Sequence, residues 1–408
     1  MDTSHLARFA RLDFAPVTAA MGKLRIGLVT SEFPPDLGGV ETYAWQLAAE
    51  LGQRPDLQVT VYAPSQSAAV HPPEGVTLKP ILTSCMGLDW PRLRHEPIDV
   101  WHALSAAHSW LALKGAPTVA SVHGNDFLAP YPLTARPALR LLGRGRMRSY
   151  LWQKFRPLSC KLTSRMLARA LPVTGALIAN SRYTADVLVS QYPGCADNSK
   201  VAWVGVAPSF FDISHATRKC RPCLLTVCRL SEPRKNVELV LYALAHLKDR
   251  FDFEYVVAGE GALRTQLEML TEELGLSARV RFAGRVSDTD LRQLYAEADL
   301  FILAASIVPG SHEGFGIVYL EAAASGVPSL AARLAGAAEA VGDGQSGYFV
   351  EEPTVASIET ALTRFFTGEI SFESEHCRAF ARQFTWARVA DVAIESYRLA
   401  HSSSLAKL

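Results

Sequence analysis

Short apolar runs of strand length alternate with amphipathic, helix-like segments along almost the whole chain. This alternation is typical of parallel β-sheets flanked by helices. In the first half, the expected strands cover residues 25–30, 58–63, 76–81, 98–104, 117–124, 176–181 and 200–206. After a polar stretch, a second series covers residues 224–230, 255–259, 280–284, 300–304, 327–332 and 347–350. The sequence therefore predicts the α/β class, with two Rossmann-like domains.

The length supports this division, because 408 residues exceed the roughly 100 to 200 residues of one ordinary domain. We expect a disordered extension over residues 1–22, a first domain over 23–207, a second domain over 208–385 and a closing helical segment over 386–408. Charges and a proline interrupt residues 1–22, so a secretory signal peptide is not expected. No run of 18 apolar residues occurs elsewhere, so no membrane-spanning helix is expected either.

Charge and cysteine content argue against several classes of protein. The 41 basic and 40 acidic residues leave a net charge of +1, which gives no global preference for nucleic acid. Seven scattered cysteines favour a reducing cytoplasm over a disulfide framework. Cys220, Cys223 and Cys228 are interpreted as ordinary thiols, because a zinc site would need a fourth ligand.

Open parallel sheets bind ligands beyond the carboxyl ends of their strands, and unusual residues follow several of the expected strands. Gly38 and Gly39 follow the first strand and precede a helix, where bare amide N–H groups could approach a phosphate closely. A plain turn remains an alternative. The segment is neither G-x-G-x-x-G nor a P-loop, which argues against a nicotinamide dehydrogenase and a P-loop NTPase.

Three further residues stand at strand ends. His123 closes an apolar strand and is expected to face the cleft, although a histidine with only a structural role is the alternative. Arg229 and Lys235 flank the loop after the first strand of the second domain. Two cations at one strand end suit a diphosphate, whereas ordinary surface charges are the alternative.

The most specific group is Glu313 and Glu321, eight residues apart in HEGFGIVYLEAAASGVP. A helix that starts near Phe315 or Gly316 would offer free N–H groups to phosphate oxygens. The two carboxylates would then lie on the order of 10 Å apart along the cleft. The D-x-D sequence at Asp288 to Asp290 is interpreted as an N-cap with an acidic first turn, not as a metal site.

From Lys23 to about Ala400, the chain resembles the family-4 retaining glycosyltransferases of GT-B architecture, chiefly through the E-x7-E arrangement in EGFGIVYLEA. The connection SIVPGSH resembles the bacterial branch that includes phosphatidylinositol mannosyltransferases. In ARLAGAAEAV the chain departs from the two glycines and proline that the family often has, so Gly336 and Glu339 carry less of the resemblance. The architecture implies a first domain that binds the acceptor, a second that binds the nucleotide-sugar, and a last helix that packs back on the first.

The resemblance also implies individual roles. Gly38 and Gly39 would approach the donor diphosphate or the acceptor, and His123 would lie beside the reacting sugar. Arg229 and Lys235 would contact the diphosphate, and the phosphate-binding helix start would comprise Phe315, Gly316 and Ile317. Glu313 would bind sugar hydroxyls and Glu321 would bind the ribose. Arg285 and Val286 would contact the base. No cofactor and no metal are expected.

A basic segment stands out independently of the family. The 59 residues between Asp126 and Asp186 contain eleven Lys or Arg and no acidic residue, while the rest of the chain has 30 basic and 40 acidic residues. Interleaved apolar residues fit a surface that lies on anionic lipid, and a solvated helical face is the alternative. Nucleic acid fits less well because no binding motif is present. The candidate membrane and acceptor surface comprises Arg140, Arg144, Arg146, Arg148 and Lys154.

The sequence thus predicts a retaining glycosyltransferase. It would move a sugar from a nucleotide-diphosphate donor, GDP-mannose or a UDP-sugar, to a lipid-linked or saccharide acceptor in glycolipid or polysaccharide biosynthesis. The expected location is the cytoplasm, at the inner face of the cytoplasmic membrane. A sugar-nucleotide epimerase of the same fold and a catalytically silent nucleotide-sugar-binding scaffold are the alternatives.

Overall fold

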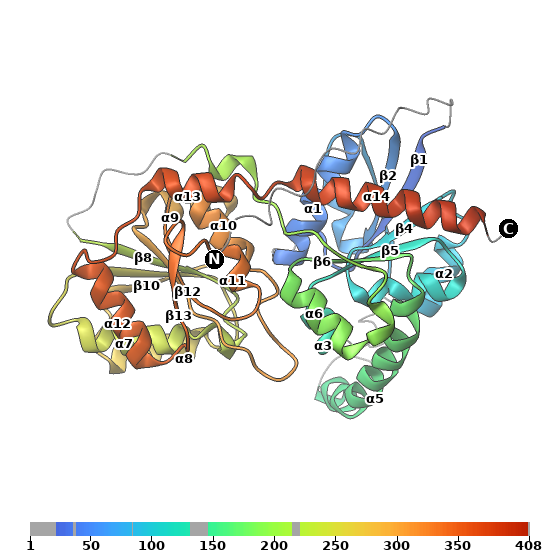
Figure 1. Cartoon of the computed structure of the whole chain (residues 1–408). Helices are drawn as coiled ribbons and strands as arrows, with labels where there is room; N and C mark the ends of the chain where they lie inside the picture. Colours follow the sequence, from blue (N-terminus) through green and yellow to red (C-terminus); the bar gives the residue numbers. More distant parts are fainter. Residues whose placement is uncertain (1–21, 36–37, 84, 131–145, 214–220, 407–408) are drawn as a thin grey trace.

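The computed structural model describes residues 22–35, 38–83, 85–130, 146–213 and 221–406, and only the backbone of residues 146–157. The extension expected over residues 1–22 therefore lies, apart from Gly22, outside the described residues. Two α/β domains lie side by side (Figure 1). One contains strands β1 to β7 and the other contains β8 to β13, which confirms the predicted fold class.

The first domain has a sheet of seven parallel strands in the order β3-β2-β1-β4-β5-β6-β7. The strands are β1 Leu24–Val29, β2 Leu57–Pro64, β3 Val76–Leu82, β4 Val100–Ala103, β5 Thr118–Val122, β6 Ala176–Ala179 and β7 Ser199–Val201. The strand order reverses between β1 and β4. Ligands of doubly wound sheets bind at such a reversal, beyond the carboxyl ends of the strands.

The second domain repeats this plan with six parallel strands in the order β10-β9-β8-β11-β12-β13. The strands are β8 Cys223–Val227, β9 Glu254–Ala258, β10 Val280–Gly284, β11 Leu300–Leu303, β12 Ser329–Ala332 and β13 Gly347–Val350. Here the order reverses between β8 and β11, so the residues that follow these two strands lie at the equivalent crevice.

The strand expected over residues 200–206 is shorter than predicted, because β7 ends at Val201. Beyond this point the chain leaves the sheet, and the Val206 N–H donates to the carbonyl of Phe384 (3.2 Å). Val204 and Val206 are nevertheless buried in a core cluster that includes residues of both domains. The apolar pattern of this segment therefore reflects the link between the domains and not strand pairing.

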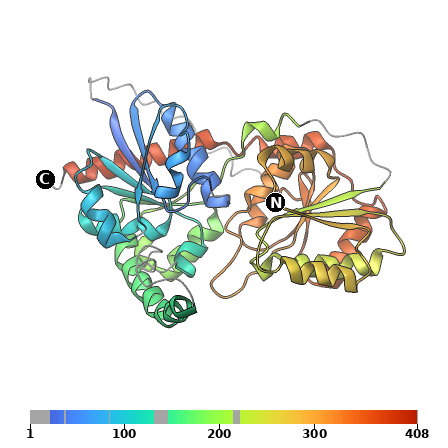
Figure 2. The ribbon, with the colours of Figure 1, turned by 180° about the vertical axis from the view of Figure 1, so that it is seen from behind.

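Helices flank both sheets (Figure 2). Their bounds are α1 Gly39–Gly52, α2 Met86–Leu93, α3 Asn125–Leu128, α5 Arg146–Ala170, α6 Arg182–Gln191, α7 Val237–Leu247, α8 Arg264–Glu273, α9 Asp288–Glu297, α10 Ile317–Ala324, α11 Ala337–Ala340, α12 Val355–Phe366, α13 Ser374–Ala381 and α14 Trp386–Leu405. Among the described residues, no helix combines the length and the apolar character that a membrane span requires.

The start of α9 explains the D-x-D sequence. The Ser287 hydroxyl accepts a hydrogen bond from the Asp290 N–H (3.2 Å), and both aspartates lie in the first helical turn. Their negative charges are favourable at the positive end of the helix dipole. The interpretation of this sequence as a helix cap is confirmed.

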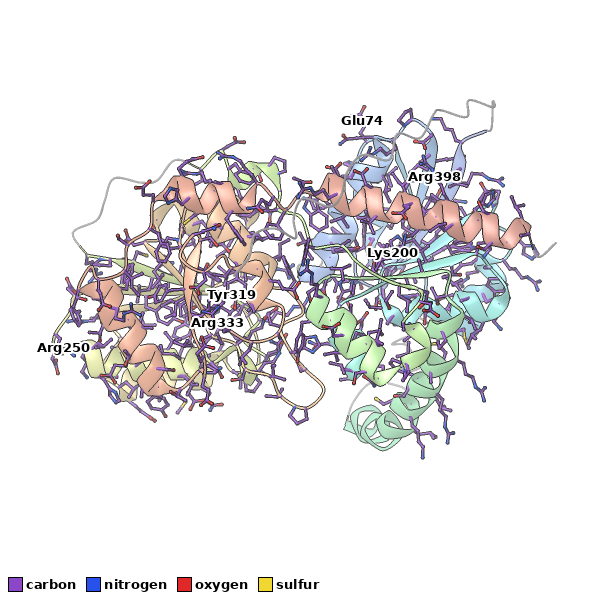
Figure 3. All side chains as sticks on the ribbon, in the orientation of Figure 1. Glu74, Lys200, Arg250, Tyr319, Arg333 and Arg398 are labelled. Atoms are coloured by element: carbon purple, nitrogen blue, oxygen red, sulfur yellow. The ribbon has the colours of Figure 1, made fainter. Side chains whose placement is uncertain are left out.

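The last helix, α14, packs on the first domain although it follows the second domain in the chain. It lies across the first sheet (Figure 1) and contacts α1, β4, β5 and β6. Ala393 and Tyr397 are buried, and the Tyr397 hydroxyl is hydrogen-bonded to His102 Nδ1 of β4 (2.7 Å). At the edge of this contact, Lys200, labelled beside α14 in Figure 3, donates to Glu395 (2.8 Å). The helix therefore completes the first domain, as the resemblance implied.

A strained turn between β12 and α11 anchors the loop that precedes α10. Ala335 has a φ of 51°, in the left-handed region, within the segment where the chain departs from the family. The next residue, Gly336, donates its N–H to the Glu313 carbonyl (3.0 Å), and a Cβ at Gly336 would collide with the Gly314 carbonyl. This turn therefore fixes the backbone that carries Glu313.

Ala335→Gly is expected to raise the free energy of unfolding by about 0.5 to 1 kcal/mol. The relief of left-handed strain should outweigh the greater entropy of glycine in the unfolded chain. Urea unfolding measures the change. Ala243→Gly, in the interior of α7, is the matched control and should lower stability by about 1 kcal/mol. A destabilising Ala335→Gly would show that the methyl group of Ala335 outweighs its backbone strain.

Candidate active site

A cavity of about 580 Å³ lies between the two domains, within the size range of small-molecule sites. It is lined by loops that follow strands of both sheets. All twelve residues that the sequence placed in the cleft line this one cavity: Gly38, Gly39, His123, Arg229, Lys235, Arg285, Val286, Glu313, Phe315, Gly316, Ile317 and Glu321. The structure therefore brings these candidates together.

The carboxylate of Glu313 forms the centre of a buried ion cluster. Lys235 Nζ lies 2.5 Å from Glu313 Oε2, and Arg234 Nη1 lies 3.3 Å from the same oxygen. Burial alone would raise the pKa of Glu313, but the two cations outweigh burial and hold this pKa below its ordinary value. Arg234, which sequence reasoning missed, is 6% exposed and also donates to Ser311 (2.8 Å). The only sequence signal for Arg234 is its place beside Lys235.

Arg229 reaches across the cleft to the first domain. Its guanidinium lies 3.3 Å from the carboxylate of Glu41, in the first turn of α1. A Cβ at Gly38 would collide with this guanidinium, whereas a Cβ at Gly39 would meet no atom within 4 Å. Gly38 thus makes room for Arg229, and Gly39 leaves the start of α1 open. Glu41 was missed, although it directly follows Val40 in the same glycine-containing segment.

The helix start expected near Phe315 or Gly316 occurs at Ile317, one residue later than the second of these. Gly316 is the N-cap with a φ of 86°, a conformation that glycine adopts without strain. Phe315 is buried, and Ile317 is half-buried at the cavity wall. The positive end of the α10 dipole therefore faces the cavity, as a phosphate-binding helix start requires.

Glu321 lies one turn further along α10 and is buried. The Tyr295 hydroxyl donates to its carboxylate (3.1 Å). Burial raises the pKa of Glu321 to about 7, and Asp288 adds to the rise, although the Tyr295 hydrogen bond opposes it. This carboxyl therefore changes its protonation state near neutral pH.

His123 is fixed from two sides. Its Nε2 lies 3.0 Å from the Leu104 carbonyl, so this nitrogen donates, and its ring lies edge-on to Tyr43 with the centroids 4.8 Å apart. The Tyr43 hydroxyl is hydrogen-bonded to Ser121, which is in turn bonded to His102. His123 therefore has both a structural hydrogen bond and a face on the cavity, and the two alternatives for it are not exclusive.

His312 is a second cavity residue that the sequence analysis missed. Its ring lies edge-on to Tyr183, with centroids 5.0 Å apart, and its backbone N–H donates to Asn125 Oδ1 (3.3 Å). Burial lowers the pKa of His312 to about 4, with a further contribution from Arg234. The ring is therefore neutral at physiological pH. Its position directly before Glu313 was the only available signal.

Further polar contacts connect the two domains. Arg285 donates to the Pro35 carbonyl of the first domain (3.2 Å), and Val286 lines the cavity beside it. Glu339 accepts hydrogen bonds from the Arg182 N–H (3.0 Å), the Tyr183 N–H (2.9 Å) and the Trp203 indole (2.7 Å). Glu339 therefore caps α6 of the first domain and lies outside the cavity lining.

The structure describes the basic candidates only in part. Arg140 and Arg144 lie outside the described residues, as does Cys220. Arg146, Arg148 and Lys154 lie on α5 in the part where only the backbone is described. This helix projects from the first domain (Figures 1 and 2). Within the described ranges, no group of three His, Cys, Asp or Glu side chains is placed to hold a metal ion.

Comparison with known proteins follows the same division into two halves. Residues 37–210 match the family model described as Glycosyltransferase Family 4, and residues 211–384 match the model described as Glycosyl transferases group 1. The chain is 29% identical to a GDP-mannose-dependent alpha-(1-6)-phosphatidylinositol monomannoside mannosyltransferase from Mycolicibacterium smegmatis, over 82% of this chain and 87% of that protein. It is 26% identical to a D-inositol 3-phosphate glycosyltransferase from Rhodococcus opacus, over 90% of this chain and 86% of that protein.

Among solved structures, a sucrose-phosphate synthase from Thermosynechococcus elongatus superposes with a TM-score of 0.73 at 16% identity. The superposition covers 93% of this chain and all of the other. At this identity the likeness shows a shared fold.

The raised pKa of Glu321 predicts a pH-dependent stability. The folded protein keeps this proton up to about pH 7, whereas the unfolded chain loses it near the ordinary value of 4.5. The contribution of this group is therefore complete at low pH and declines as pH rises from 4.5 to 7. Glu321→Gln should raise the free energy of unfolding at pH 8 by about 1 to 3 kcal/mol, and by less at pH 5.

Urea unfolding at the two pH values measures this difference. Glu273→Gln, an exposed position on α8, is the control and should change stability equally at both. An equal effect of Glu321→Gln at pH 5 and pH 8 would contradict the raised pKa.

Proposed function

Because the chain belongs to the glycosyltransferases, with a family 4 domain followed by a group 1 domain on the GT-B fold, we propose a donor, an acceptor and a stereochemical course for its reaction. It takes a sugar from a nucleotide-diphosphate donor, GDP-mannose or a UDP-sugar, and attaches it with retention to a lipid-linked or saccharide acceptor. The names of the relatives, one of them GDP-mannose-dependent, support this choice of donor and acceptor. The observation that carries the proposal is the buried Glu313 cluster beside the start of α10.

The charges of the cavity suit the departure of a nucleoside diphosphate. Cleavage of the donor develops negative charge on the diphosphate and positive charge on the sugar ring. Arg229 is an accessible cation of the cavity, with 46% of its side chain exposed. Its ion pair with Glu41 is therefore weak enough to exchange for a phosphate. Lys235 and the start of α10 approach the same phosphates from the second domain.

Glu313 has a different part in the reaction. Its carboxylate, held by Lys235 and Arg234, accepts hydrogen bonds from hydroxyls of the sugar, and Glu321 accepts from the ribose. Preoriented groups of this kind stabilise the transition state without reorganising during the reaction. The acceptor hydroxyl attacks from the face that the diphosphate leaves, and the departing phosphate takes its proton. Because fixed cations and a helix dipole meet the diphosphate charge, no metal ion or other cofactor is required.

We also propose that the protein binds the inner surface of the cytoplasmic membrane through α5. Leu158 and Leu162, one helical turn apart, are 55% and 49% exposed. Lys161 and Arg165 are exposed beside them. This combination of leucines and basic residues suits an anionic lipid surface.

Turnover of candidate donors tests the enzymatic proposal. Lys235→Met should lower kcat/KM by about 10² to 10³-fold, because it removes one charge that stabilises the transition state. The fold should survive, because Arg234 still pairs with Glu313. Lys200→Met, which removes a surface ion pair with Glu395, is the control and should leave turnover within about twofold, in line with the small worth of such pairs.

The same assay includes excess EDTA, which should not slow the reaction, and NMR of the product, which should show the anomeric configuration of the donor. Absence of transfer from any nucleotide-sugar, or an inverted product, would contradict the proposal. A donor epimerised without acceptor would point to the epimerase alternative.

Sedimentation with vesicles tests the membrane proposal. The wild-type protein should sediment with anionic vesicles at low salt and less at high salt, because salt screens the attraction. Changing Lys161 and Arg165 to Glu should reduce sedimentation without changing donor binding. The same change at Arg250 and Arg281, exposed in the second domain, alters net charge equally and should have little effect. Equal losses in both variants would rule out a docking surface on α5.

A further inference from the structure

Asn180 has an unsatisfied polar group at the cavity wall. It directly follows β6, lines the cavity and is only 8% exposed. Its carboxamide oxygen is buried without a hydrogen-bond partner among the described residues. A buried acceptor left unpaired costs about 1 to 3 kcal/mol, so this arrangement is unfavourable in the unliganded protein.

Hydrogen bonds in the segment after Asn180 fix the backbone that carries this side chain. The next residue, Ser181, caps α6 by accepting a hydrogen bond from the Thr184 N–H (3.0 Å). The Thr184 hydroxyl donates to the Gly314 carbonyl of the second domain (3.2 Å). Asn180 is therefore held between the end of β6 and a helix cap that is itself attached to the opposite domain.

The opposite domain brings the donor-binding loop against Asn180. A Cβ on Gly314 would lie 2.8 Å from Asn180 Nδ2 and would also collide with the His123 carbonyl. Gly314 directly follows Glu313 and lies two residues before Gly316, the N-cap of α10. The space beside Asn180 is thus adjacent to the proposed diphosphate position, where the transferred sugar and the attacking acceptor meet.

The unpaired carboxamide oxygen of Asn180 determines which chemical group can bind there. A carboxamide oxygen accepts hydrogen bonds and cannot donate them, and diphosphate oxygens are acceptors too. A sugar or polyol hydroxyl is the donor that this part of the cavity would receive. We propose that Asn180 is a substrate-binding residue whose carboxamide oxygen accepts a hydrogen bond from a sugar-type hydroxyl at the transfer site. The inference rests on the proposed function and adds a residue of the first domain to it.

A second asparagine shows what a structural role looks like in this chain. Asn198 Oδ1 is also buried without a partner among the described residues. Its amide nitrogen, however, donates to the carbonyls of Leu171 (3.2 Å) and Thr174 (2.7 Å). Asn198 lies outside the cavity lining, so it is a matched control for loss of an asparagine that acts only on the fold.

Asn180→Leu separates the two roles, because leucine has a similar shape and no polar atom. Removal of an unpaired buried acceptor should leave the melting temperature of the unliganded protein unchanged or raise it. The kcat/KM for sugar transfer should fall at least tenfold, because the hydroxyl loses its partner. Affinity for the nucleoside diphosphate alone should stay within twofold. Asn180→Ser retains an acceptor oxygen without adding a charge beside the diphosphate and should recover part of the lost activity.

Asn198→Leu should behave in the opposite way, with a lower melting temperature and kcat/KM within about twofold. Two further measurements identify the hydroxyl. Weaker binding of the nucleotide-sugar without acceptor places it on the transferred sugar, whereas an increase confined to the acceptor KM places it on the acceptor.

Several results would overturn the inference. They are a lower melting temperature of Asn180→Leu with unchanged kcat/KM, an equal loss of affinity for the nucleoside diphosphate, or no recovery in Asn180→Ser. If the wild-type protein transfers sugar and Asn180→Leu transfers it equally well, this inference alone fails. A wild-type protein that transfers no sugar removes the proposed function as well.

Discussion

The buried ion cluster around Glu313 is the contact on which the cavity depends. A carboxylate removed from water is costly unless cations and hydrogen bonds compensate it, and a buried carboxylate left without any cation is strongly destabilising. Lys235 and Arg234 come from the loop after β8, whereas Glu313 lies before α10. The cluster therefore ties together the two loops that meet at the strand-order reversal of the second sheet. This one cluster therefore determines both the position of the α10 start and the charge of the cavity lining next to it.

The polar contacts between the domains are of a different kind. Arg229 with Glu41, Arg285 with the Pro35 carbonyl, and Glu339 with the start of α6 are polar contacts between separate surfaces. Such contacts are individually weak where water reaches them. The second domain is therefore rigid at its cluster, while the ion pair of the cavity residue Arg229 with Glu41 can be exchanged for a ligand contact.

Sequence reasoning found the strands because parallel strands buried on both faces appear as short apolar runs, as in β5 and β11. It found Glu313, Lys235 and Glu321 because strand ends concentrate ligand-binding residues. It could not find Arg234, because neighbouring basic residues look alike until tertiary packing buries one of them. It could not find Glu41 or Asn180 either, since their importance arises only where two domains meet. Residues 202–206 were misassigned because burial between domains imitates a strand.

The path of α14 has a consequence for synthesis on the ribosome. The face of the first sheet around His102 is covered by Ala393 and Tyr397, which are separated from it by nearly 300 residues of chain. Contacts so distant in sequence form late and slowly. While the nascent chain ends before Trp386, that apolar face and the His102 ring have no permanent cover. The first domain to leave the ribosome is therefore the last to be completed, and the second domain must fold while its neighbour is still unfinished.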